Sequence, residues 1–214
     1  MMEFPAIDSL DENLFRALEK LSQIWRNRLG QAVFSEDLSL VQGQILIFIS
    51  QHSPQRNRVG KIAQEFGLTT ATISEAVAAL TRKGLLNKTV DPQDKRVHQL
   101  RLTSEGALVV NRLLSWAREI KAEIKAGDFR QKKETFSFLL TLIARLRRNG
   151  VVAAVRMCWF CQHFHPDYFP RVHRPHYCVL LARAIGLADI RLDCSRFVAS
   201  AQLSRNRNNL GSAE

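Results

Sequence analysis

Apolar residues recur every three or four positions near the start of the chain, which is the period of an amphipathic helix. The pattern predicts a helix over residues 9–30, with a stripe made of Leu14, Leu18, Leu21 and Trp25. A second helix is expected from Ser39, because a hydroxyl residue followed three positions later by Gln42 has the spacing of a capping box. Its apolar residues are Ile45, Leu46 and Ile49.

Residues 59–84 predict two short helices joined by a sharp turn. The first helix carries Val59, Ile62, Ala63 and Phe66, and the second carries Ile73, Val77 and Leu80. Ala63 is small enough to lie where the helices touch, and Gly67 can adopt the positive φ that the turn needs. The β-like runs 85–90 and 97–102 follow, joined by the polar tip DPQDKR. This order predicts a winged helix-turn-helix.

After residue 103 two more helices with coiled-coil-type seams are expected, interrupted near Gly127. The seam residues are Val110, Leu113, Ala117, Ile120 and Ile124 in the first, and Phe136, Leu139, Ile143 and Leu146 in the second. Seams at both ends of a chain would be wet in a monomer, so they favour a dimer. The expected fold is mainly α, an α+β winged helix with helical dimerisation regions and a small Cys-rich appendage.

The expected division of the chain follows from these patterns. A dimerisation helix covers residues 9–34, the winged helix 37–103, and further dimerisation helices 104–149. A Cys/His-rich metal-binding segment covers 150–198, and a polar tail, 199–214, is expected to be disordered.

Charge narrows the choice of partner. The chain has 31 Lys and Arg against 20 Asp and Glu, a net charge of +11, which favours an anionic partner such as double-stranded DNA. No apolar run is long enough to span a membrane, and the acidic N-terminus lacks the pattern of a secretory signal. We therefore expect a cytoplasmic protein.

The segment LTTATISEAVAALTRKGLLNKTVDPQDKRVHQLRLTSEG closely resembles the recognition helix and wing of MarR-type regulators, and the order of elements matches over roughly residues 10–148. In the wing, Asp94 and Arg96 match the family's acidic and basic residues. The resemblance implies a homodimer that binds an inverted-repeat operator, commonly as a repressor released by a small-molecule or redox effector.

The residues themselves support a DNA-reading surface. If the apolar stripe of residues 69–82 points inward, small side chains face outward near the start of that helix, where they could meet base edges in the major groove. Arg96 is the candidate for the minor groove, with Asp94 supporting it, and Lys88, Lys95 and Arg101 would add sequence-independent affinity. The predicted DNA-binding residues are Thr70, Ala71, Thr72, Ser74, Glu75, Arg82, Lys88, Asp94, Lys95 and Arg96. Glu75 as a plain exposed carboxylate and Asp94 as a turn former are open alternatives.

All four cysteines lie in the last quarter of the chain, at Cys158, Cys161, Cys178 and Cys194. Four thiolates can complete the tetrahedral shell of zinc, the first choice here, and an iron–sulfur cluster or free thiols remain alternatives. Four histidines lie between the second and third cysteines, so mixed ligation also stays open: His163, His165, His173 and His176. A site of this kind could be structural or could sense metal or redox state.

Two other functions were weighed. An enzyme could use the CxxC as a dithiol centre or the Cys/His group as catalytic zinc, but no thioredoxin-like pattern surrounds Cys158 and no glutamate lies near the cluster in sequence. We therefore expect no enzyme. A protein-interaction module that does not bind DNA is the second alternative.

Overall fold

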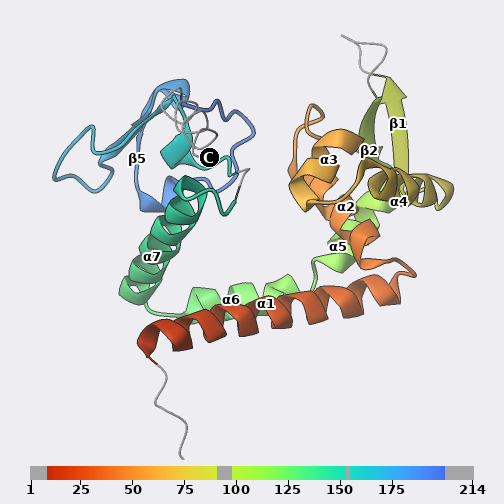
Figure 1. Ribbon diagram of the computed structural model, residues 1–214, viewed down its shortest axis with the longest axis horizontal. Helices are drawn as coiled ribbons and strands as arrows, with labels where there is room; N and C mark the ends of the chain where they lie inside the picture. Colours follow the sequence, from red (N-terminus) through yellow and green to blue (C-terminus); the bar gives the residue numbers. More distant parts are fainter. Residues whose placement is uncertain (1–8, 91–97, 153–154, 201–214) are drawn as a thin grey trace, which may run out of the picture. The chain divides into compact units, whose positions relative to one another are not determined.

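The computed structural model describes residues 9–90, 98–152 and 155–200, and it is mainly α-helical, as predicted. The chain divides into two compact units, Met1–Glu123 and Ile124–Glu214 (Figure 1). The first contains α1 (Leu10–Ser35), α2 (Leu40–Gln51), α3 (Val59–Phe66), α4 (Thr70–Arg82), β1 (Leu86–Val90), β2 (His98–Leu102) and α5 (Ser104–Leu113). Helix α6 (Ala117–Ala126) crosses the boundary between the units.

Local capping explains where the first helices begin. Ser9 caps α1, its side chain accepting from the backbone N–H of Glu12. At α2 both bonds of the predicted capping box are present, since Ser39 Oγ accepts from Gln42 N (3.2 Å) and Gln42 Oε1 accepts from Ser39 N (3.1 Å). Among the described helices none is long and apolar enough alone to cross a membrane, and α1 with α2 passes that test only as a pair bent by 97°.

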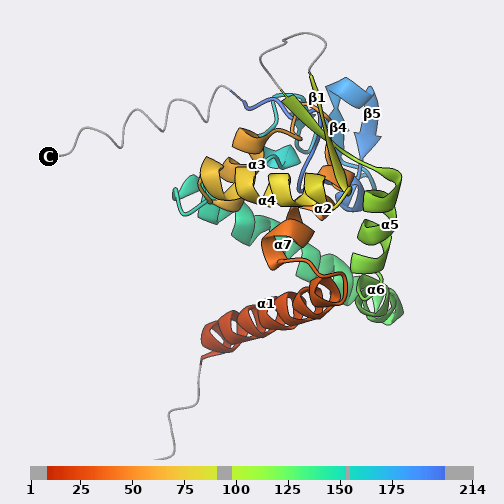
Figure 2. The same cartoon turned by 90° about the vertical axis from the view of Figure 1, so that its right-hand side faces the viewer.

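The core of the first unit is built by α1 to α5, the wing and the start of α6. Ile45, Ile62, Ile73 and Leu80 are fully buried in it, together with Leu86 at the start of β1. The strands β1 and β2 pair antiparallel over their whole length, with Leu86 opposite Leu102. Both views show α3, α4 and the hairpin side by side (Figures 1 and 2). The predicted winged helix-turn-helix is therefore confirmed for the described residues.

The helical region after the wing differs from the prediction. Residues 104–126 were expected to form one continuous seam, but the helix breaks between Leu113 and Ala117. Trp116 lies in this break, is 7% exposed, and packs edge-on against Trp25 of α1 with ring centroids 4.7 Å apart. This contact lies where the chain turns between α5 and α6.

The second unit joins α7 (Phe129–Arg148) to the cysteine-bearing segment. That segment contains η1 (Cys158–Phe160), β3 (Phe164–His165), β4 (His176–Cys178), η2 (Val179–Leu181), β5 (Arg183–Ile185) and η3 (Leu187–Asp189). Leu140 and Ala144 of α7 are buried in one hydrophobic cluster with Met157, Phe160, Phe164, Ile185 and Ile190. The sequence pattern predicts α7 as a dimerisation helix within residues 104–149, whereas its most buried face packs on the segment that follows it.

The predicted disordered tail began at residue 199, but its first two residues are ordered. Ala199 forms an antiparallel bridge with Cys161, and the backbone N–H of Ser200 donates to the Phe160 carbonyl (3.0 Å). These bonds continue the contact between the cysteine turn and the end of the chain. Residues 201–214 lie outside the described residues.

Candidate nucleic-acid interface and cysteine cluster

Helix α4 is held at a sharp angle to α3 by the turn between them. Gly67 has φ +63°, in the left-handed region, as the sequence predicted. Thr69 caps α4: its Oγ1 accepts from Thr72 N (3.1 Å) and lies 2.9 Å from Thr72 Oγ1. Ile73 and Val77 are 0% exposed, so the inner face of α4 is anchored in the core. The opposite face is consequently fixed in orientation and open to a ligand.

The predicted DNA-binding residues within the described chain all lie on the surface. The exposed ones are Thr70, Ala71, Thr72, Ser74, Glu75, Arg82, Lys88 and Arg101. Those on α4 are small and uncharged from Thr70 to Ser74, and charge appears only from Glu75 onward. Asp94, Lys95 and Arg96, at the wing tip, lie outside the described residues.

Hydrogen bonds join the base of the wing to two other segments. The N–H of Leu100 donates to the Asn57 carbonyl (2.7 Å), and the buried Asn57 side chain donates to the Ile49 carbonyl of α2 (3.1 Å). On the other side Thr103 Oγ1 donates to the Gly84 carbonyl (2.7 Å). Sequence reasoning missed Asn57, because an asparagine in a proline-containing loop gives the same signal as an ordinary turn former.

One ion pair joins α5 to the segment after α1, and another joins the end of α4 to the same segment. Arg112 donates to both oxygens of Glu36 (2.7 and 2.9 Å), and these bonds hold the pKa of the Glu36 carboxyl below its ordinary value. Lys83, directly after α4, binds Asp37 Oδ2 at 2.6 Å and lowers the pKa of that carboxyl. Arg112 is half exposed and Asp37 is 99% exposed, so solvent screening keeps the contribution of both pairs to stability modest.

Backbone hydrogen bonds bring the four cysteines around one short stretch of chain. Cys161 N donates to the Cys158 carbonyl (2.9 Å) and closes the CxxC turn. Cys178 is paired across the sheet with Phe164, three residues beyond that turn. Cys194 N donates to the carbonyl of Arg156, which lies two residues before the CxxC turn (3.1 Å). The structure thus brings together residues that are far apart in sequence.

The thiols share one electrostatic neighbourhood. Burial raises the pKa of the Cys158 thiol, the other three cysteines raise it further, and a hydrogen bond from Arg191 N to Cys158 Sγ (3.3 Å) opposes them. All four are unbridged and half-buried. Within the described residues, no three His, Cys, Asp or Glu side chains are already gathered so as to hold a metal ion.

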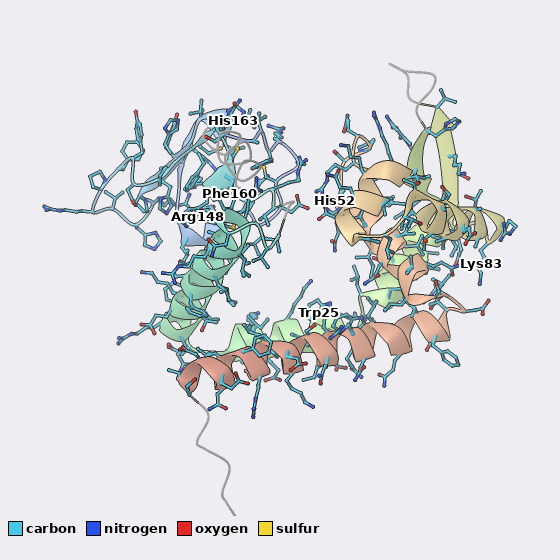
Figure 3. All side chains as sticks on the ribbon, viewed as in Figure 1. Trp25, His52, Lys83, Arg148, Phe160 and His163 are labelled. Atoms are coloured by element: carbon cyan, nitrogen blue, oxygen red, sulfur yellow. The ribbon has the colours of Figure 1, made fainter. Side chains whose placement is uncertain are left out.

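The histidines are less well placed as ligands. His176 Nδ1 accepts from the backbone N–H of Asp167 (3.1 Å), and its ring packs near Trp159 and Phe164. His165 and His173 are exposed, and His163 is half-buried beside the cysteine turn (labelled in Figure 3). Ligation by the four thiols and mixed Cys/His ligation both stay predictions.

Comparison with known proteins identifies the family of the helix-turn-helix and wing. The MarR family model covers residues 38–98. The chain is 30% identical to YdcH, an HTH-type transcriptional regulator of Bacillus subtilis, over 122 residues (56% of this chain, 81% of YdcH), and 26% identical to YwaE of the same organism over 137 residues (64% and 77%).

Solved structures show the same fold. A MarR-family regulator from Silicibacter pomeroyi superposes with a TM-score of 0.54 at 22% identity (68% of this chain, 96% of that chain). The MepR–DNA complex of Staphylococcus aureus gives a TM-score of 0.51 at 23% identity (65% and 99%). With the helix-turn-helix, the hairpin and these matches in agreement, the chain belongs to the MarR family.

Proposed function

We propose that this protein is a sequence-specific DNA-binding transcription regulator that acts as a homodimer on a pseudo-palindromic operator, as a repressor. The carrying observation is the exposed face of α4, which is small and uncharged from Thr70 to Ser74 and backed by the core. Such a face can lie deep in the major groove, where alanine and threonine methyl groups meet thymine methyls.

Charge and kinship support the same function. A net charge of +11 supplies sequence-independent attraction to phosphates, and Lys88 and Arg101 on the wing strands are exposed. The similar YdcH and YwaE are named HTH-type transcriptional regulators, and MepR was solved bound to DNA. These relatives favour a binding role over an enzymatic one.

Dimerisation is proposed from α1, whose apolar side chains are uncovered in the single chain. Leu10 is 75% exposed, Leu21 62% and Ile24 42%, and Trp25 is half exposed (labelled in Figure 3); at 100° per residue these four lie on one side of the helix. A row of large apolar side chains on a 26-residue helix marks an interaction site. A second copy would cover this surface and present two α4 helices to half-sites about 10 bp apart.

A cytoplasmic location fits this function, because the operator is there and thiols stay reduced in that compartment. The cysteine-bearing segment is the proposed sensory input, answering to metal or redox state, and a small-molecule effector is a further candidate.

The test is fluorescence anisotropy of the full-length protein with duplexes from its own upstream region and scrambled duplexes of equal length. We expect preference for the upstream sequence and a steep loss of affinity with salt. Sequence selection should give a palindromic site for the wild type and an altered site for Ala71→Val. Ala107→Val, an equal change at an exposed position of α5, is the matched control and should select the wild-type site.

Two results would contradict the proposal. Equal affinity for upstream and scrambled duplexes would refute sequence-specific regulation and favour an interaction module. A monomer in sedimentation velocity at every concentration, with or without DNA, would refute the homodimer.

A further inference from the structure

We propose that Cys158, Cys161, Cys178 and Cys194 together bind one zinc ion, and that this zinc fastens the chain after residue 155 onto helix α7. The assignment deepens the proposed function by giving its sensory segment a ligand, but zinc binding can be measured without DNA.

The first step is convergence of the ligands. Two hydrogen bonds join Cys158 to Arg191, which lies three residues before Cys194. Cys158 N donates to the Arg191 carbonyl (3.1 Å), and Arg191 N donates to Cys158 Sγ (3.3 Å). On the other side, Val179 N, next to Cys178, donates to the His163 carbonyl (2.9 Å). Each of the two distant cysteines is thus held beside the CxxC turn by its own backbone bonds.

The second step is that this small fold needs a cross-link to be stable. The strands after α7 are two or three residues long, and a sheet of such strands is marginal by itself. The cluster that holds the second unit contains seven buried residues, two of them supplied by α7. Small folds with so little buried apolar surface generally need a metal or disulfides, and all four cysteines are unbridged.

The third step is the chemistry of the donors. Four thiolates are the complete tetrahedral shell of a structural zinc site, whereas the histidines are exposed or otherwise engaged. The N–H from Arg191 to Cys158 Sγ is the kind of bond that stabilises a metal-bound thiolate. The position of Cys194 is supported by Arg156, whose guanidinium donates to the Cys194 carbonyl (3.1 Å).

The fourth step concerns assembly and consequence. The other three cysteines act on Cys158 electrostatically, but the four thiols are not gathered as a ligand set in the described residues, so zinc binding would draw them together. The gathered turn carries Phe160, which is 5% exposed and lies under the Arg147 guanidinium of α7, 4.4 Å from its ring centroid. Phe160 and the C-terminal end of α7 lie together in Figure 3. Zinc occupancy would therefore determine how firmly α7 is covered.

The experiment measures zinc, iron and sulfide in the full-length protein, purified anaerobically without chelators. We expect about one zinc per chain and no iron. Each single Cys→Ser variant should lose most of the zinc, whereas His173→Gln, an exposed histidine in the same segment, should keep it. Cobalt should give the visible bands of a tetrahedral thiolate complex.

A measurement on the wild type covers variants that do not fold. An organomercurial added stepwise should release zinc, and tryptic cleavage at Arg183, Arg191 and Arg196 should accelerate in proportion. Iron with sulfide, absence of metal, or zinc retained in the Cys→Ser variants would each overturn the proposal. Zinc-loaded protein that does not distinguish duplexes would refute the regulator and leave the zinc site standing.

Discussion

Replacing Gly106 by alanine should damage the base of the wing. Gly106 lies in the first turn of α5, and a Cβ there would meet the backbone oxygen of Leu85 at 2.1 Å. That is about 1.4 Å shorter than the roughly 3.5 Å of a good nonbonded contact. Leu85 O also accepts from Thr103 N (3.1 Å), so neither backbone can retreat without breaking that bond.

The magnitude follows from two opposing effects. Alanine in place of glycine in a helix gains up to about 1 kcal/mol, and overpacking a core commonly costs about 1 to 3 kcal/mol. Since the clash is with backbone, we expect Gly106→Ala to lose about 1 to 2 kcal/mol of unfolding free energy. Leu85 directly precedes β1, so DNA affinity should fall as well.

Gly60→Ala is the matched control, because Gly60 lies in α3 with open space where a Cβ would stand. It should leave stability equal or raise it by up to about 1 kcal/mol. Urea unfolding is followed by fluorescence in a Trp159→Phe background, in which Trp25 and Trp116 report only on the first unit. A Gly106→Ala protein as stable as Gly60→Ala, with full DNA affinity, would refute this packing argument.

Three further predictions follow. Glu36→Gln should be less stable than the wild type at neutral pH, because Arg112 stabilises only the ionised carboxyl. Urea titrations should show the difference in stability vanish as pH falls below the carboxyl's ordinary pKa of 4.5. A difference that persists in acid would contradict this prediction. Lys88→Ala should weaken binding to specific and scrambled duplexes alike and reduce the salt slope by about one, as anisotropy at several salt concentrations would show; unequal losses would imply base reading. Leu140→Ala should destabilise the second unit by about 2 to 5 kcal/mol, measured by Trp159 fluorescence. Phe138→Ala, at an exposed position of the same helix, should not. Equal effects of the two substitutions would refute the burial of this face of α7.

Local sequence was sufficient to predict the helix-turn-helix and the wing. The amphipathic stripe of α4, the positive φ of Gly67 and the two wing strands follow from residue type and spacing, which act within a few positions of the chain. The candidate DNA-contacting residues of α4 could be named for the same reason, because burying Ile73 and Val77 leaves only one face outward.

Contacts between distant segments decided the remainder. The seam of α7 could equally serve another helix or the segment that follows it, and only the buried contacts of Leu140 and Ala144 show the second choice. Trp116, in the break before α6, meets Trp25, ninety-one positions away, and no local pattern specifies that contact.

The sequence by itself determined the family, the charge and the identity of the four thiols, because these are properties of residue type and order. The tertiary structure decided which surface each helix buries and which cysteines become neighbours. Burial energy and hydrogen bonding depend on partners brought together by the fold, and spacing along a chain does not specify those partners.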